Sequence, residues 1–166
     1  MTLYVLRHGI AEDAAPGGDD RARTLTPRGR IRLRAGARGM RALGMRIGVL
    51  LTSPLARAAE TAAIVSEVYG GQPTPRMLPA LAAGVPPVET VRGLRPFLRQ
   101  GPVMIVGHEP GLSGVVSLLL TGSADGMSLA LKKGGLVALE LGDRSAQPGA
   151  SLSFMLTPRE LRRLGR

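Results

Sequence analysis

The two histidines of the chain, His8 and His108, are the residues best suited to chemistry. His8 directly follows Arg7, and a further arginine, Arg57, stands four positions after Ser53. A neutral imidazole is a competent nucleophile toward phosphorus, and the planar donors of arginine match phosphoryl oxygens. The chain has no cysteine, which excludes thiolate nucleophiles, disulfides and zinc-thiolate sites. Two histidines are also too few for the usual multi-histidine metal site, so we expect no metal and no cofactor.

Each of these residues lies at or just beyond the end of a short apolar run. Three runs without helical periodicity predict strands buried on both faces: residues 2–7, 47–52 and 103–106. In an open α/β sheet, ligands bind at the carboxyl edge of parallel strands, where loops and helix N-termini converge. We therefore expect Arg7, His8, Arg57 and His108 to meet at one edge of a sheet.

Such an arrangement would suit a phosphoryl group. Arg57 follows the predicted start of a helix at Ser53-Pro54, where unpaired backbone N–H groups favour an anion. Nearby arginine charges would depress the pKa of His8 and keep its imidazole neutral near pH 7. The arginines and His108 would then stabilise charge on the equatorial oxygens of a transferring phosphoryl group.

Helix patterns alternate with the strands. Helices are expected from Thr26-Pro27 to Gly44, and over residues 55–69, 88–99, 112–120 and 158–165. Residues 136–141 and 151–156 predict an antiparallel pair at a sheet edge, joined by a turn that includes Gly142, Asp143, Pro148 and Gly149. Residues 11–26 and 71–87 are Gly- and Pro-rich, which predicts loops.

This order of elements predicts the fold class. Strands that alternate with helices are typical of an α/β fold, here with three α/β/α layers, a mostly parallel mixed sheet and an antiparallel C-terminal strand pair. A length of 166 residues predicts a single domain over residues 1–166. The N-terminal apolar run ends at Arg7, which is too short for a signal sequence, and no run is long enough to span a membrane. We expect a cytoplasmic protein with no membrane partner.

Positive charge is concentrated in one part of the chain. The formal net charge is +10, and residues 21–46 carry nine arginines and no acid. Arg30, Arg34, Arg38 and Arg41 form a stripe on the first predicted helix; we interpret it as a solvated face, or as a docking face for an acidic phosphoprotein or nucleic acid. Aromatic residues make up only 2% of the chain, which leaves little for bases to stack on and disfavours a nucleic-acid partner.

Three motifs in this order resemble the histidine phosphatase superfamily, which has a phosphoglycerate-mutase-like fold. They are Leu6-Arg7-His8-Gly9, Ser53-Pro54-Leu55-Ala56-Arg57-Ala58 and Val106-Gly107-His108-Glu109-Pro110. The compact layout is similar to the SixA-type phosphohistidine phosphatases. The resemblance implies that His8 becomes phosphorylated, that Arg7, Arg57 and His108 form the phosphate pocket, and that the partner is a phosphohistidine-bearing protein.

The sequence departs from phosphoglycerate-mutase-like members in the segment where they usually place a carboxylate general acid. Residues 77–84 contain no acid. An alkoxide leaving group needs a proton more urgently than an imidazole, which can depart already protonated, so the missing acid favours an N–P bond. If an acid is used, the candidates are Glu12, Asp13 and Glu109.

Some residues near these motifs have simpler structural interpretations. We expect Ser53 to cap the N-terminus of the second helix, Glu60 to pair with Arg57 along that helix, and Gly9 and Gly107 to form backbone turns. Lys132-Lys133 is interpreted as a solvated loop that can also touch a protein substrate.

Two alternatives to a phosphohistidine phosphatase stay open. The same pocket could hydrolyse a small phosphate ester such as a sugar phosphate or a nucleotide. The arginine stripe could instead belong to a protein that binds a phosphorylated or nucleic-acid partner with little turnover.

Overall fold

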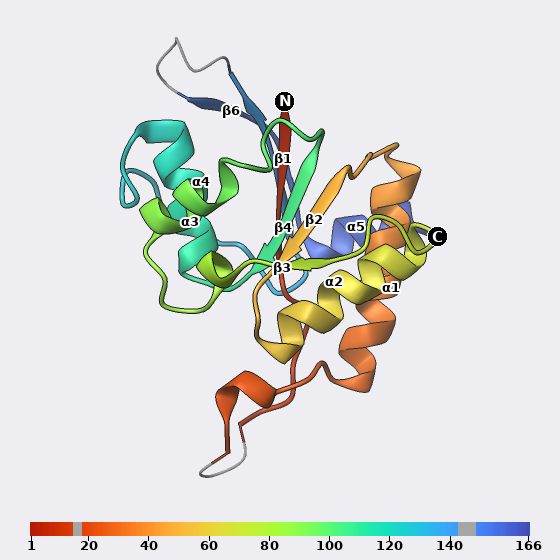
Figure 1. Cartoon of the computed structure of the whole chain (residues 1–166). Coiled ribbons are helices and arrows are strands. Elements are labelled where there is room, and N and C mark those ends of the chain that lie inside the picture. Colours follow the sequence, from red (N-terminus) through yellow and green to blue (C-terminus); the bar gives the residue numbers. More distant parts are fainter. Residues whose placement is uncertain (15–17, 143–148) are drawn as a thin grey trace.

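The computed structural model describes residues 1–14, 18–142 and 149–166 (Figure 1). Within these ranges the strands form one sheet, with the order β3-β2-β4-β1-β5-β6. The strands are β1 Thr2–Arg7, β2 Val49–Thr52, β3 Arg76–Met77, β4 Val103–Gly107, β5 Leu136–Leu141 and β6 Ala150–Leu156. The first four run parallel, whereas β5 is antiparallel to β1 and β6 is antiparallel to β5. The predicted mixed sheet with an antiparallel C-terminal pair is confirmed.

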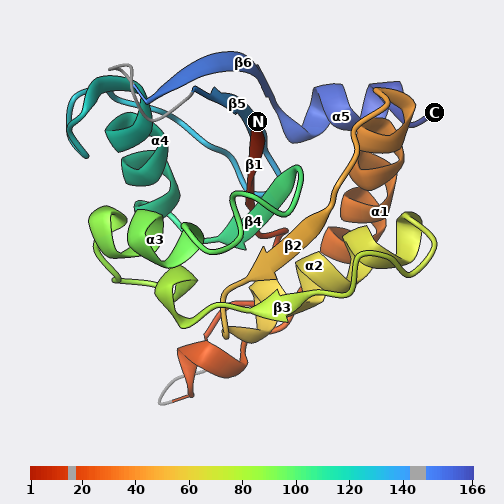
Figure 2. The same cartoon turned by 45° about the horizontal axis from the view of Figure 1, so that its top comes forward.

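Helices cover both faces of the sheet (Figures 1 and 2). The helices α1, α2 and α5 lie on one face, and α3 and α4 lie on the other. Their bounds are α1 Pro27–Ala42, α2 Ala56–Val68, α3 Pro87–Leu94, α4 Gly111–Thr121 and α5 Pro158–Leu164, with short 3-10 helices η1 Asp20–Ala22 and η2 Pro79–Leu81. The predicted α/β/α layering is therefore confirmed, and in the described part of the chain no helix has the length and apolarity needed to cross a membrane.

The sheet divides the core into two apolar clusters. Leu3 and Val5 of β1 belong to the cluster under α3 and α4, whereas Leu6 belongs to the cluster under α1, α2 and α5. Successive side chains of a strand point to opposite faces, so a strand covered on both sides must be apolar throughout. This explains why β2 and β4 carry no alternation of apolar and polar residues, and both are buried along their whole length.

The register of the three central strands brings their carboxyl ends level. Arg7 lies opposite Gly107 in the β1–β4 pair, and Thr52 lies opposite Val106 in the β2–β4 pair. Pairing continues just past the strands, where His8 N donates to Gly107 O at 3.1 Å. The residues that follow β1, β2 and β4 therefore share one edge of the sheet.

The structure differs from the sequence prediction in three segments. Residues 11–26, predicted as a loop, contain η1. Residues 71–87, predicted as a loop, contain β3 and η2. β3 has only two residues, and both are exposed, so it carries no apolar pattern that could predict a strand. It is defined by its pairing with β2. The helix predicted over 88–99 ends at Leu94, because Pro96 has no N–H to donate to Arg92 O. The predicted turn residues Asp143 and Pro148, and residues 15–17 of the predicted 11–26 loop, lie outside the described residues.

Two glycines near the site are not the turns that the sequence suggested. Neither Gly9 nor Gly107 is among the glycines with positive φ. A Cβ on Gly9 would lie 3.2 Å from Leu25 Cδ2, and one on Gly107 would lie 3.1 Å from Leu112 Cδ2. Their role is a close approach between backbone and a neighbouring side chain.

Close backbone contact between α1 and α5 generates a stability prediction. A Cβ on Gly39 would lie 1.9 Å from Leu161 O, whereas a Cβ on Gly36 would lie 3.8 Å from Leu161 Cβ, an ordinary contact. We expect Gly39→Ala to lower the free energy of unfolding by about 1–3 kcal/mol or more, because α5 must move away. Gly36→Ala on the same helix should raise it by roughly 0.5–1 kcal/mol through helix propensity. Urea unfolding of both variants measures the difference, and equal stabilities would contradict this packing.

Candidate active site

The two histidines lie side by side at the carboxyl edge of the sheet. Their ring centroids are 5.1 Å apart with a tilt of 50°, and each residue is only 6% exposed. His8 follows β1 and His108 follows β4, which are neighbouring strands. The structure thus brings together the two imidazoles, as the strand-end argument predicted.

His8 is held in one orientation by its own loop. Its Nδ1 lies 2.7 Å from Gly9 O, and because a carbonyl can only accept, Nδ1 must be the donor. A neutral His8 therefore carries its lone pair on Nε2, where a nucleophile would need it. Gly9 N donates to Thr61 Oγ1 at 3.0 Å, and Thr61 Oγ1 donates to Arg57 O at 2.7 Å. This chain of hydrogen bonds ties the His8 loop to α2.

His108 contacts a residue for which the sequence suggested another role. Its Nε2 lies 2.8 Å from Ser53 Oγ, which also accepts from Leu55 N at 3.2 Å. The helix α2 begins at Ala56, with Leu55 at its N-cap and no side-chain cap. The N-cap prediction for Ser53 is therefore wrong, because its hydroxyl is used in the turn before the helix and against His108. Among the described residues, His108 Nδ1 is buried without a hydrogen-bond partner.

The two arginines approach the histidines from different sides. Arg7 Nη1 donates to Leu131 O at 2.8 Å, and its Nε is buried with no partner in the described part of the chain. Arg57 is nearly buried and donates twice to Asp20, from Nη1 to the backbone oxygen at 2.8 Å and from Nη2 to Oδ2 at 3.1 Å. Within the described residues, two of the five N–H donors of Arg57 are thus used, and the other three are left for a ligand.

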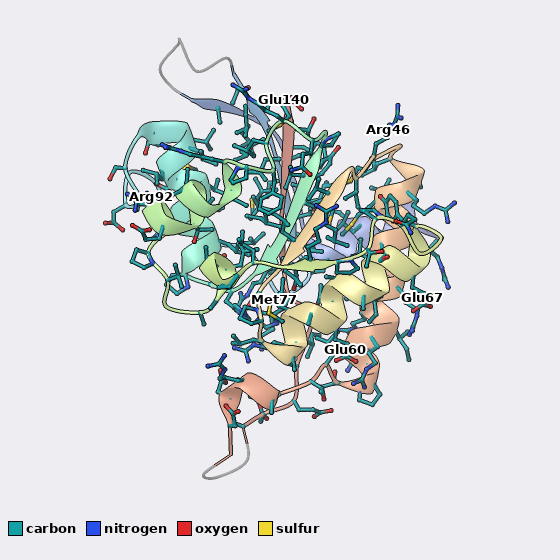
Figure 3. All side chains as sticks on the ribbon, in the orientation of Figure 1. Arg46, Glu60, Glu67, Met77, Arg92 and Glu140 are labelled. Carbon is teal, nitrogen blue, oxygen red and sulfur yellow. The ribbon has the colours of Figure 1, made fainter. Side chains whose placement is uncertain are left out.

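Glu60 does not pair with Arg57, which corrects the sequence prediction. Its carboxylate accepts from Leu25 N at 2.7 Å and pairs with Arg30. Glu60 and Glu67 both lie where α2 runs beside α1 (Figure 3). Glu60 thus pairs with a cation of α1. The carboxylate that pairs with Arg57 is that of Asp20.

Two of the four arginines of the predicted stripe form ion pairs with α2. Arg30 pairs with Glu60, and Arg34 donates to Glu67 at 3.1 and 3.0 Å. Arg41 donates to Val68 O at 2.7 Å. Arg30 and Arg34 are thus paired with carboxylates of α2, whereas Arg38 and Arg41 are exposed, as expected for a solvated face. A docking role of the stripe stays a prediction.

The environment of the histidines favours their neutral forms. Burial is the main cause that lowers the pKa of His8 from 6.5 to about 3, with further lowering by His108, Arg57 and Arg7. Burial and then Arg57 lower the pKa of His108 to about 4, while the Asp20 carboxylate acts in the opposite sense. Positive charge beside a neutral imidazole is an environment that attracts an anion.

The three candidate acids lie in different surroundings. Glu12 and Asp13 are exposed. Glu109 is partly buried next to His108, and its Oε1 is buried with no partner among the described residues. Glu109 and His108 also line a small cavity against residues 81–85, the segment that lacks an acid. Of the three carboxyl groups, Glu109 is the one that the structure places beside a histidine.

Similarity to known proteins agrees with this geometry. The family model "Histidine phosphatase superfamily (branch 1)" matches residues 3–82, which include Arg7, His8 and Arg57. The chain belongs to the histidine phosphatase superfamily. It is 34% identical over 148 residues to an uncharacterized protein of Picosynechococcus sp., with 86% of each chain covered.

Solved structures show that the phosphatase fold extends over the whole chain. The protein histidine phosphatase SixA, complexed with tungstate, superposes with a TM-score of 0.84 at 23% identity, covering 97% of this chain and 99% of that one. A putative alpha-ribazole-5'-P phosphatase from Escherichia coli gives 0.73 at 17% identity, covering 95% and 97%. The predicted phosphoglycerate-mutase-like fold and the SixA-like relation are confirmed.

The pKa values of this histidine phosphatase are directly measurable because it has two histidines. We expect neither imidazole resonance in an NMR titration to show a midpoint between about pH 5 and 8. Because the folded pKa values lie below 6.5, the unfolded chain binds more protons below that pH, so stability should fall as the solution is acidified toward about pH 4. A midpoint near 6.5 for either resonance would contradict the buried neutral pair.

The contact of Asp20 with Arg57 generates a second prediction for this site. Hydrogen bonds from Arg23 and then Arg57 hold the pKa of Asp20 below its ordinary value, so a carboxylate competes with any anion at Arg57. Asp20→Asn should tighten binding of orthophosphate about two- to fivefold, as expected for an ion pair with an exposed partner. Isothermal titration calorimetry with orthophosphate measures the affinity of the wild type and of the variant.

Asp19→Asn is the matched control, because it removes the same charge one residue away and Asp19 instead caps η1. Weaker phosphate binding by Asp20→Asn would show that Asp20 positions Arg57 instead of competing for it.

Proposed function

We propose that this histidine phosphatase hydrolyses phosphohistidine in a protein, through a phosphorylated His8. The observation that carries the proposal is the His8 imidazole, with Nδ1 donating to Gly9 O, Nε2 left unprotonated, and His108 5.1 Å away between centroids. The cations beside it would bind the phosphoryl oxygens. A phosphatase of this family, with a fold like that of SixA, agrees with this assignment.

The reaction would proceed in two displacements at phosphorus. In the first, the lone pair of His8 Nε2 forms a bond to phosphorus while the N–P bond of the substrate breaks and the substrate imidazole leaves. In the second, water attacks the phosphorylated His8, the His8–phosphorus bond breaks and orthophosphate is released. Arg7, Arg57 and His108 would hold the equatorial oxygens in both steps, which is the larger part of catalysis in phosphoryl transfer.

The choice of an N–P bond follows from the missing acid. The substrate imidazole can leave with its own proton, so the first step needs no general acid. Residues 77–84 contain no carboxylate, and η2 of this segment lies against β4 of the sheet. This segment therefore offers no proton to the leaving group, which suits a leaving group that is already protonated.

A small phosphate ester is the second candidate, and Glu109 favours it. Its buried Oε1 beside His108 is a possible proton donor for an alkoxide leaving group. The structural similarity to an alpha-ribazole-5'-P phosphatase agrees with this alternative.

The nucleophile is tested by His8→Asn. We expect kcat/KM for a phosphohistidine peptide to fall by at least about a thousandfold, because the side chain of asparagine has no basic nitrogen that could attack phosphorus. Wild-type protein mixed with ³²P-phosphohistidine peptide and quenched in alkali should show label on His8. Wild-type rates in His8→Asn would remove His8 as the nucleophile.

The leaving group is tested by Glu109→Gln. If the physiological bond is N–P, this variant should keep its rate on a phosphohistidine peptide within about threefold. If a phosphate ester is the true substrate, the rate at which Glu109→Gln hydrolyses that ester should fall by about 10²–10⁴-fold, the usual contribution of a general acid. The comparison of kcat/KM for the two substrate classes, in wild type and variant, decides between them.

A further inference from the structure

A cationic groove lies beside the predicted catalytic loop. It has a volume of about 390 Å³ and runs between α1, α5 and the turn before β5. Gly9 and Ile10, which follow His8, form one wall. Its cationic lining consists of Arg32, Lys132, Lys133, Arg159, Arg162 and Arg163.

These six cations differ from those of the arginine stripe. None of them forms an ion pair with any residue in the described ranges, whereas Arg30 and Arg34 on the same helix α1 are neutralised by α2. The groove is lined by one carboxylate, that of Glu160, which already accepts from Thr157 N at 2.7 Å in the capping box of α5. Six cations and one carboxylate thus line the groove, which leaves it with a large excess of positive charge within the described fold.

The cations are also close enough to repel one another. Burial lowers the pKa of Arg162, and so do the neighbouring charges of Arg32, Arg159, Arg166 and Arg28. Like charges gathered on two packed helices destabilise the fold slightly unless a counter-charge relieves them. The arrangement is therefore suited to an anionic ligand.

Hydrogen bonds connect the groove to the predicted phosphate pocket. Gly134 N donates to the carbonyl oxygens of Arg7 and His8, each at 3.0 Å. Leu131, directly before the two lysines, accepts from Arg7 Nη1. The turn that carries Lys132 and Lys133 thus holds the same strand end that presents His8, so a ligand in the groove lies next to the reacting group.

We propose that this groove binds an acidic segment of the protein substrate, beside its phosphorylated histidine. The inference rests on the proposed function for the identity of the substrate. Charge complementarity favours carboxylates, and the groove between two helices suits a single extended chain. No aromatic residue lines it, so it has no platform on which nucleic-acid bases would stack.

Binding is tested first without any phosphate. The probe is a fluorescein-labelled peptide with six consecutive glutamates, compared with the same peptide in which glutamine replaces each glutamate. At low ionic strength we expect the glutamate peptide to bind at least tenfold more tightly, with the preference lost as salt screens the charges. Fluorescence anisotropy measures both affinities. Equal affinity for the two peptides would overturn the proposal.

Charge reversal in the groove gives the decisive comparison. Arg159→Glu/Arg163→Glu changes two exposed residues. In this variant the glutamate preference, which is the ratio of the affinities for the glutamate and glutamine peptides, should fall to about one. The matched control is Arg95→Glu/Arg99→Glu, which changes net charge equally at exposed positions after α3, on the opposite face of the sheet (Figure 1). An equal loss in this control would show an effect of net charge alone and overturn the proposal.

A second variant comes from another wall of the groove. Lys132→Ala/Lys133→Ala should also reduce the glutamate preference, by at least threefold, and thermal unfolding checks that each variant is folded. If a single-stranded oligonucleotide of equal charge binds more tightly than the glutamate peptide and loses binding in these variants, the groove is a nucleic-acid site and the proposal is wrong.

Turnover separates this inference from the proposed function. Phosphohistidine peptides flanked by six glutamates or six glutamines should differ at least tenfold in kcat/KM, mostly through KM, and Arg159→Glu/Arg163→Glu should abolish the difference. If neither peptide is hydrolysed but the glutamate preference in binding persists, the phosphohistidine assignment fails while the docking groove stands. If both are hydrolysed equally well, the groove fails while the assignment stands.

Discussion

The site depends on the register of β1, β4 and β2. Parallel pairing that sets Arg7 opposite Gly107 and Thr52 opposite Val106 leaves the next residues of all three strands at one level. This register makes His8 and His108 neighbours, and their burial lowers their pKa values. A shift of one residue in either pair would turn the side chains that follow to the other face of the sheet.

Burial has an electrostatic consequence for the chemistry. An imidazole that is removed from water and placed near guanidinium groups is held neutral, so it retains the lone pair with which it can attack phosphorus. The same arginines cannot lose their protons and so remain cations for the phosphoryl oxygens. Asp20 is the counter-charge that binds Arg57 in this structure, which makes the segment before α1 part of the site, although no sequence motif marks that segment.

Much of this site follows from sequence, because its residues sit at strand ends and strand ends are marked by the apolar runs before them. The positions of Arg7, His8 and His108 could be anticipated in this way, as could the layers of the fold. The partners of individual charges could not. Glu60 is three residues from Arg57, yet it pairs with Arg30 of α1, and the choice depends on how α1 and α2 pack. Likewise β3 has no apolar pattern and exists only through its neighbour β2.

Which cations are paired and which are not could likewise not be predicted from the sequence. A stripe at helical spacing on α1 suggested a solvated or docking face, but three of its four arginines bind α2. The cations of the groove, which have no ion-pair partner in the described chain, come from three separate segments, α1, α5 and the turn before β5, and no periodicity in the sequence links them. Only the packing of α5 through Gly39 and Leu161 brings them together.

A crystal structure of the protein soaked with tungstate tests the central claim most directly. We expect one tetrahedral anion within hydrogen-bond distance of His8 Nε2, with His108 and the Arg57 guanidinium also forming hydrogen bonds to its oxygens. An anion that binds only among Lys132, Lys133 and Arg159, with both imidazoles free, would contradict it.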